Sequence, residues 1–134
     1  MNDVRVRRGD PDDLVPVLRV LEGALLDVTA ADVRAGLDEG RVYVAVAARE
    51  QWDAPVVGAL LHEGGHVTAV AVPRHRRGEG IGRALIEAAA ADVAAPDEPL
   101  TADFDPEVRG FYEAIGFEIR QEDDRLHGTW TPDR

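Results

Sequence analysis

The residues best suited to chemistry lie between positions 70 and 83, where a predicted strand runs into a glycine-rich turn and then into a predicted helix. Glycine occupies positions 78, 80 and 82 of this stretch. Glycine adopts positive φ angles at little cost and leaves no side chain between the backbone and a ligand. The N–H groups of such a turn, together with those of a helix N-terminus, can bind an anion. We therefore expect this turn to hold an anionic ligand.

The charge distribution supports an anionic ligand at the turn. The chain has 15 basic and 26 acidic residues and a formal net charge of −11, which argues against nucleic acid or an anionic membrane surface as a partner. Residues 74–83 nevertheless contain four arginines and one glutamate, a local charge of +3. A basic segment in so acidic a chain favours a polyanionic ligand. The alternative interpretation is a glycine-rich helix start with solvated arginines.

Two common phosphate-binding motifs do not fit the turn. A Walker A loop requires Gly-Lys-Ser/Thr after the first glycines, and no such sequence follows here. The dinucleotide fingerprint G-x-G-x-x-G would require glycine where the chain has Arg83. The chain also has no cysteine, which excludes a cysteine nucleophile, a cysteine-based zinc site and a disulfide framework.

The hydrophobic pattern and the turn residues predict the elements that position this stretch. Helices are predicted to begin at Asp10-Pro11 and at Thr29, where Asp32 completes a capping box. Further helices are predicted over 82–95 and from 105–106 to 114. Strands are predicted near 4–6 and over 41–48, 55–62, 66–72, 100–104, 117–121 and 125–131. The order β α α β β β α β α β β predicts one α+β domain over residues 1–134, with a mostly antiparallel, twisted sheet of about seven strands flanked by helices.

Two segments resemble the motifs of the GNAT superfamily of N-acetyltransferases. Residues 77–82, Arg-Gly-Glu-Gly-Ile-Gly, match the signature Q/R-x-x-G-x-G/A, and residues 105–117 resemble the second motif, N-x-x-A-x-x-F-Y-x-x-x-G-F. Asp105 and Val108 stand where the family usually has Asn and Ala, and Pro73 lies one residue closer to the strand than is common. The resemblance implies a GNAT-like fold, acetyl-CoA as the acyl donor and no metal.

The resemblance also implies how acetyl-CoA is held. In the family, main-chain N–H groups of the glycine-rich turn bind the pyrophosphate, and the preceding strand pairs its free edge with the pantetheine amides. An N–H near Ala71 or Val72 would face the thioester carbonyl, where a donor stabilises the charge that develops on oxygen. Asp105 is implied either to cap the following helix or to cap it and also contact the cofactor. The cofactor-binding residues implied in this way are Ala71, Val72, Arg77, Gly78, Gly80, Ile81, Gly82, Arg83, Asp105 and Tyr112.

The reaction so implied is acyl transfer from a thioester to an amine. Tyr112 matches the family's tyrosine that donates to the leaving thiolate, and packing beside Phe111 is its alternative role. An alkyl amine with a pKa of about 10 is mostly protonated at neutral pH, so a base or a water relay must remove a proton. The candidate bases are Glu63, His62 and His66, around the turn before the cofactor strand, and His127 on the last strand. Of these, Glu63 and His66 are the catalytic residues that we predict beside Tyr112.

We therefore predict an acetyl-CoA-dependent N-acetyltransferase in which a primary amine attacks the thioester directly in a ternary complex. The acceptor is a small-molecule or peptide amine that the sequence does not identify. One alternative is a non-catalytic CoA-binding sensor or partner-binding module, and another is a binder of a different phosphate ligand such as a nucleotide. The oligomeric state stays open, although homodimers are common in such folds.

The composition bears on the protein's surroundings. All 15 basic residues are arginine and none is lysine, a bias that either a GC-rich genome or adaptation to molar salt produces. With the acidic excess, we favour a halophilic type of protein. The N-terminus lacks the apolar stretch of a secretory signal, and no segment approaches the roughly 18 apolar residues of a membrane span. We expect a cytoplasmic protein that does not associate with membranes.

Overall fold

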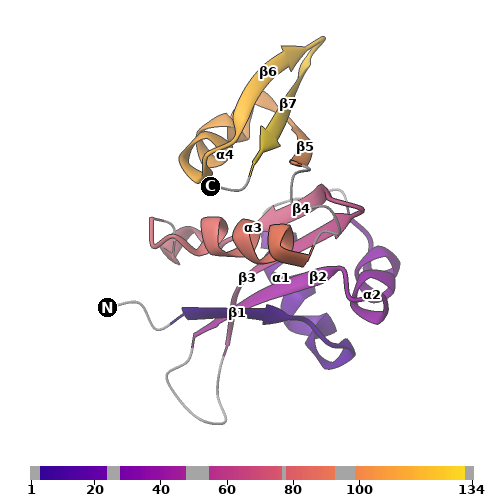
Figure 1. Cartoon of the computed structure of the whole chain (residues 1–134). Coiled ribbons are helices and arrows are strands. Elements are labelled where there is room, and N and C mark those ends of the chain that lie inside the picture. The colour runs from indigo at the N-terminus through magenta and orange to yellow at the C-terminus, as the bar shows by residue number, and fades with distance from the viewer. Residues whose placement is uncertain (1–3, 24–27, 48–54, 77, 93–98, 132–134) are drawn as a thin grey trace.

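A computed structural model describes residues 4–23, 28–47, 55–76, 78–92 and 99–131 of the chain. In these ranges seven strands form one sheet in the order β1-β2-β3-β4-β5-β7-β6, with helices on both faces (Figure 1). The strands are β1 (Val4–Arg8), β2 (Val42–Ala47), β3 (Val56–Glu63), β4 (His66–Ala71), β5 (Leu100–Phe104), β6 (Glu118–Glu122) and β7 (Arg125–Trp130). The helices are α1 (Leu14–Gly23), α2 (Ala30–Asp38), α3 (Ile81–Asp92) and α4 (Arg109–Ile115), with 3-10 turns η1 (Pro11–Asp13), η2 (Arg74–Arg76) and η3 (Pro106–Val108).

The pairing between β4 and β5 differs from every other pairing in the sheet. These two strands are parallel, whereas all other neighbours are antiparallel. They pair only at His66 with Thr101 and at Val67 with Ala102. Strand β4 continues to Ala71, so its second half has no strand partner on the β5 side within the described sheet. The sheet therefore opens between β4 and β5, and Figure 1 shows β5, β7 and β6 as a group set apart from β1–β4.

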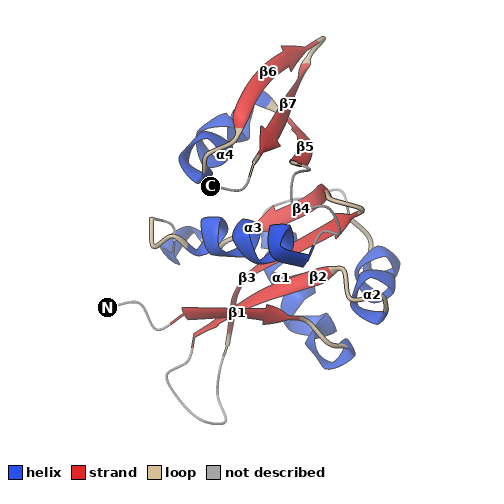
Figure 2. Cartoon of the chain, in the orientation of Figure 1, coloured by secondary structure: helices blue, strands red, loops and turns tan. Residues whose placement is uncertain are grey.

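Two hydrophobic clusters, one on each face of the sheet, hold the helices in place. One cluster joins α3 and α4 to all parts of the sheet and contains Leu85, Ile86 and Ile115. The other joins α1 and α2 to β2, β3 and β4 and contains Val17 and Leu37. This second cluster includes no residue of β5, β6 or β7. Figure 2 shows the consequence, with α1 and α2 beside β1–β4 and α4 beside β5–β7.

The predicted fold is confirmed, including the element order and the seven-stranded, mostly antiparallel sheet. The capping box predicted at Thr29 and Asp32 forms. Asp10, predicted as an N-cap, also forms a capping box, because its side chain accepts from a backbone N–H group and Asp13 accepts in return. The Asp10 box opens a 3-10 turn before α1 begins. The last three residues of the helix predicted over 82–95 lie outside the described ranges.

Two details of the sequence prediction need correction. The strand predicted to end at 72 ends at Ala71, because Pro73 and η2 follow at once. Asp105 does occupy the N-cap position of η3, but its side chain makes no capping hydrogen bond. Its carboxylate lies instead 4.0 Å from Arg125.

Within the described part of the chain, no helix has the length and apolar character needed to cross a membrane.

Candidate active site

The glycine-rich turn between η2 and α3 has the backbone geometry that its sequence predicts. Gly78 and Gly80 have φ angles of 85° and 83°, in the region where residues with a side chain are strained. A Cβ at either position would have no atom within 4 Å. Crowding therefore does not explain these two glycines, whereas the backbone conformation does. The face of the turn at both positions is open to a ligand.

The turn borders a groove at the N-terminus of α3. The groove has a volume of about 440 Å³. Ala84 is the first residue whose N–H bonds back to the turn, to the Gly80 carbonyl, so the N–H groups of Ile81 and Gly82 are not used within the described helix. Unpaired donors and the positive end of a helix together favour an anion. The groove is lined by Val72, Arg76, Gly78, Gly80, Ile81, Gly82, Arg83, Phe111, Ala114 and Ile115.

The third glycine, Gly82, has a different role from the other two. A Cβ at this position would lie 3.1 Å from Ile115 Cδ1 and 3.2 Å from Phe111 Cζ. Gly82 therefore lets α4 pack closely against the first turn of α3. Arg83 fixes the same contact, because its Nη1 donates to the Ile115 carbonyl at 3.2 Å. The sequence identifies Gly82 as part of the binding turn, whereas the structure also makes it a packing position.

Acidic partners offset part of the basic charge around the groove. Arg76 lies 3.3 Å from Glu79, and Arg83 lies 3.3 Å from Glu87. Arg77, which the sequence assigns to the cofactor site, lies outside the described residues. The local excess of positive charge predicted from the sequence is therefore partly compensated within the fold. The main-chain N–H groups of the turn are better candidates than the arginine side chains for hydrogen bonds to an anion.

Tyr112 lies in an aromatic stack beside the groove. Its ring stacks on Phe104 with centroids 3.9 Å apart, and it makes edge contacts with Phe111 and Phe117. The residue is 7% exposed, and burial raises the pKa of its hydroxyl to about 12. None of the described residues hydrogen-bonds this hydroxyl. Tyr112 is thus a core residue, as one of its two predicted roles requires, and it is not among the residues that line either cavity. Its role as a donor to the leaving thiolate stays a prediction.

A second cavity, of about 530 Å³, lies at the point where β4 and β5 diverge. Along β5, Leu100, Ala102 and Phe104 belong to the core under α3 and α4, so the residues between them face the other side of the sheet. The cavity is on this other side and the glycine-rich groove is on the helix side. It is lined by His66, Val67, Thr68, Asp103, Glu122, Asp123, Asp124, Arg125, Leu126 and His127.

The candidate bases are distributed unequally around this second cavity. His66 and His127 both line it. Glu63 is exposed at the end of β3 and is not among the lining residues. His62 is buried and stacks on Tyr43, with ring centroids 5.9 Å apart. Burial, and then the nearby Arg41 guanidinium, lower the pKa of His62, so this imidazole stays neutral in the core.

The remaining predicted cofactor residues occupy the strand end and the start of η3. Ala71 is the last residue of β4, and Val72 lines the glycine-rich groove. Asp105 lines neither cavity. The glycine-rich groove thus lies past the end of β4, and the polar second cavity lies at the start of β4 beside β5 and β7.

Comparison with known families agrees with this arrangement. The sequence profile of the Acetyltransferase (GNAT) domain family matches residues 24–131. This chain belongs to the GNAT family. Its class of chemistry is therefore that of the acyltransferases, and the resemblance seen in the two sequence motifs is confirmed. No curated protein matches the sequence.

Solved GNAT structures have the same fold at low sequence identity. A GNAT-family acetyltransferase from Bacillus cereus is similar with a TM-score of 0.76 at 15% identity, over 98% of this chain and 99% of that one. Ard1 from Thermoplasma volcanium is similar with a TM-score of 0.71 at 18% identity, over 98% and 99% of the two chains. Diaminobutyrate acetyltransferase EctA from Paenibacillus lautus, solved with L-2,4-diaminobutyric acid and coenzyme A, gives a TM-score of 0.71 at 15% identity, over 98% and 96%.

Sequence reasoning missed several polar residues of the second cavity, among them Asp103. Its carboxylate accepts from His127 Nδ1 at 2.7 Å, although the two residues are 24 positions apart. The alternation of apolar and polar residues in β5 was a signal that Asp103 faces away from the core. The sequence does not show that Asp103 contacts His127, because only the register of β5 against β7 brings the two residues opposite each other.

Proposed function

We propose that this GNAT protein is an acetyl-CoA-dependent N-acetyltransferase that moves an acetyl group from the thioester to a primary amine by direct attack in a ternary complex. The observation that carries the proposal is the opening of the sheet beyond the short β4–β5 ladder, with the glycine-rich groove past the end of β4 and the second cavity at the start of β4, on the other face. Such an arrangement would give donor and acceptor separate sites on the two faces of the sheet. It needs no covalent intermediate on the enzyme, and the chain has no cysteine that could form one.

The glycine-rich groove is the proposed site of the CoA pyrophosphate. The N–H groups of Gly78, Gly80, Ile81, Gly82 and Arg83, at the turn and the start of α3, are the proposed donors. Arg77, which lies outside the described residues, stays a further donor predicted from the family motif. The open face at Gly78 and Gly80 is consistent with this role, because a ligand can approach the backbone there without meeting a side chain. Acetyl-CoA supplies the acyl group when it is bound.

The unpaired edge of β4 is the proposed site of the pantetheine arm. Beyond Val67 this edge has no partner in the described part of β5. Ala71 and Val72, at the end of β4, are the proposed source of the N–H that stabilises the thioester oxygen during attack. Asp105, at the start of η3, stays a cofactor contact that the family motif predicts. Its exposed carboxylate would make that contact.

Tyr112 is the proposed donor to the leaving thiolate. A thiol has a pKa of about 8.5, so a phenol with a pKa of about 12 is the weaker acid of the two. Complete proton transfer from Tyr112 is therefore unfavourable, and its contribution is a hydrogen bond from a hydroxyl that stays protonated. The thiolate would take its proton from solvent.

The second cavity is the proposed acceptor site. An amine that arrives protonated meets a lining with more carboxylates than arginines, since Asp103, Glu122, Asp123 and Asp124 face a single Arg125. His66, which the sequence predicts as a catalytic residue, lines this cavity, and Glu63, the other predicted one, lies at the end of β3 before the same turn. A cationic small molecule or a peptide amine fits this lining. The structurally similar diaminobutyrate acetyltransferase EctA was solved with an amine of this kind, L-2,4-diaminobutyric acid, and with coenzyme A.

The proposal is tested by measuring thiol release from acetyl-CoA with a panel of diamines, amino acids and peptides with free N-termini. Because the chain has no cysteine, a thiol-reactive dye reports CoA release with no background from the enzyme. We expect release that depends on both the enzyme and the amine. Calorimetry with CoA and with ATP separates the alternatives. Tight CoA binding without transfer to any amine would leave a CoA sensor, and preference for ATP would overturn the CoA site.

A further inference from the structure

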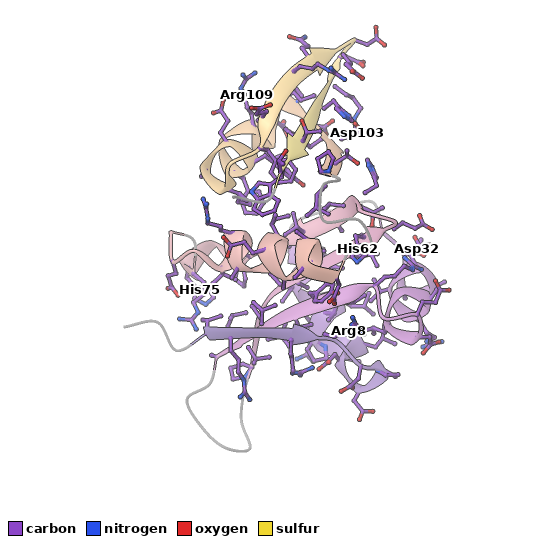
Figure 3. The ribbon with its side chains drawn as sticks, in the orientation of Figure 1. Arg8, Asp32, His62, His75, Asp103 and Arg109 are labelled. Carbon is purple, nitrogen blue, oxygen red and sulfur yellow. The ribbon has the colours of Figure 1, made fainter. Side chains whose placement is uncertain are left out.

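Three polar side chains from three strands meet at the point where β4 and β5 separate. His66 is on β4, Asp103 on β5 and His127 on β7. Asp103, labelled in Figure 3, lies between the two histidines. Asp103 and His127 are direct cross-strand partners, and His66 pairs with Thr101, two residues before Asp103 on the same face. The sheet itself therefore sets the spacing of this cluster.

The contact between Asp103 and His127 selects a tautomer of the imidazole. His127 Nδ1 lies 2.7 Å from Asp103 Oδ1. An ionised carboxylate only accepts hydrogen bonds, so Nδ1 must carry a proton. In the neutral ring, Nε2 then holds the lone pair. No residue that the structure describes hydrogen-bonds Nε2 of His127, which leaves this nitrogen as a proton acceptor on a residue that lines the cavity.

His66 is less well placed for the same task. Its Nδ1 lies 2.7 Å from the Thr101 hydroxyl, and its Nε2 lies 3.8 Å from Asp103 Oδ2. Both ring nitrogens of His66 thus face protein groups. His127 is also the less exposed of the two, with 24% of its side chain accessible against 40% for His66. The geometry favours His127 over His66 as the base.

We propose that His127 Nε2 accepts the proton of the acceptor amine, with Asp103 as the positioning residue that holds Nδ1–H. This inference rests on the N-acetyltransferase function proposed above. The ammonium group of the acceptor gives one proton to Nε2, which passes it to water in the open cavity. The neutral nitrogen then attacks the thioester carbon. The C–N bond forms, the C–S bond breaks with its electron pair going to sulfur, and the remaining excess proton on nitrogen leaves and neutralises the thiolate through solvent.

The charged groups around His127 come from all the strands next to it. Arg120 of β6 is its direct cross-strand partner and pairs with Glu122 at 3.1 Å. On β7, Arg125 lies on the same face, two positions away. The groups that any pH profile of this site must include are Asp103, Asp105, Arg120, Glu122, Arg125 and His66. Only Asp103 makes a hydrogen bond to the His127 ring among the described residues.

The first test compares His127→Gln with Arg5→Gln, in which an exposed residue of β1, outside both cavities, is changed. With the amine that gives the fastest thiol release, we expect kcat of His127→Gln to fall by about 10²-fold, the usual effect of losing a general base. Arg5→Gln is expected to match the unchanged protein. The pH profile of kcat/KM should change in His127→Gln and stay the same in the control variant. A His127→Gln variant that retains full activity and the same pH profile would overturn the proposal.

The second test isolates the role of Asp103 and does not depend on turnover. Long-range ¹H–¹⁵N NMR spectra of the free protein report which ring nitrogen carries the proton. We expect His127 to be in the Nδ1–H form in the unchanged protein and to lose this preference in Asp103→Ala. In a separate kinetic measurement, Asp103→Ala should lower kcat and leave the KM for acetyl-CoA within about twofold. Exogenous imidazole is expected to restore part of the activity of His127→Ala. The Nε2–H form in the unchanged protein would refute the positioning role, whereas absence of thiol release with every amine would refute the enzyme assignment itself and this inference with it.

Discussion

At the scale of single residues, Tyr112 shows how burial changes a chemical role. The sequence assigns it as a proton donor with the ordinary acidity of a phenol, of about pKa 10. The stack with Phe104 and the edges of Phe111 and Phe117 remove it from water, which raises its pKa to about 12. A hydroxyl that stays protonated at every working pH can donate a hydrogen bond reliably but does not give up its proton.

We expect Tyr112→Phe to lower kcat by about 10- to 100-fold, because a hydrogen bond to a developing charge contributes about 1.5–3 kcal/mol. The dissociation constant of CoA should stay within about twofold, since the ring still fills the stack. The matched control is Tyr43→Phe, which changes the other tyrosine of the chain. The hydroxyl that it removes donates to Asp92, away from both cavities. Equal turnover of Tyr112→Phe and the unchanged enzyme would remove Tyr112 from the mechanism.

The ion pair between Arg7 and Asp13 couples stability to pH. Arg7 donates to both carboxylate oxygens, at 2.8 and 3.1 Å, and this contact holds the pKa of Asp13 below its ordinary value. A lowered pKa means that the unfolded chain takes up the proton first as pH falls. The stability from this pair is therefore present above the ordinary aspartate pKa of about 4 and is lost on going below it.

Arg7→Ala should lower the free energy of unfolding by about 1 kcal/mol at pH 7, a modest value because the Arg7 side chain is 41% exposed. The deficit should shrink toward zero as the pH falls below about 4. Urea unfolding at pH 7 and at pH 3 measures both quantities. Arg5→Ala is the control, because Arg5 has no ion pair within the described residues, and it should change stability by less than about 0.5 kcal/mol. A deficit for Arg7→Ala that grows in acid would contradict the assignment.

At the scale of elements, the turn before α3 uses its three glycines in two ways. Gly78 and Gly80 supply positive φ angles with open space around them, whereas Gly82 supplies room for α4. The three glycines are evenly spaced in the sequence, so the spacing does not separate these roles, whereas the packing does. Gly128 of β7 is a second packing position, because a Cβ there would lie 2.9 Å from the Phe117 ring and 3.0 Å from the Phe104 ring. The stack that holds Tyr112 depends on this absence of a side chain.

We expect Gly80→Ala to weaken CoA binding by at least about fivefold, because an alanine in the left-handed region costs about 1 kcal/mol or more and the turn can relax to escape it. The control is Gly64→Ala, at φ 57° in the β3–β4 turn, which also has no atom within 4 Å of the added Cβ. It should cost similar stability and leave CoA affinity unchanged. Calorimetric titration of CoA into the two variants makes the comparison. Similar affinity in both would show that the turn is not the phosphate site.

At the scale of the whole molecule, the sheet consists of two groups of strands joined by the short β4–β5 ladder. Apolar packing under α3 and α4 continues across this join, whereas the packing under α1 and α2 stops at it. The face of β5, β7 and β6 that is left without a helix carries the polar residues of the second cavity. The uneven distribution of helices therefore leaves room for the second cavity, the proposed acceptor site.

The net charge of −11 carries a prediction for the whole chain. If the acidic surface is an adaptation to salt, stability should keep rising in KCl beyond about 1 M, where the Debye length is already about 3 Å and simple screening is complete. We expect the melting temperature to increase by about 4 °C or more between 1 and 3 M KCl, roughly 1 kcal/mol. A plateau above 1 M would assign the arginine bias to genome composition. Thermal unfolding followed by circular dichroism at a series of KCl concentrations decides between them.

The sequence by itself determined the element order, the N-cap at Asp10, the capping box at Thr29, the glycines of the turn before α3 and the family. These features are local, because caps, positive-φ glycines and motif spacing act within a few residues of chain. The tertiary structure alone decided which of the candidate histidines share a cavity, that Asp103 joins His127, and that Gly82 serves packing. Those facts depend on strand register and on which face each helix covers. Register is a property of two strands brought together, so neither strand's sequence contains it alone.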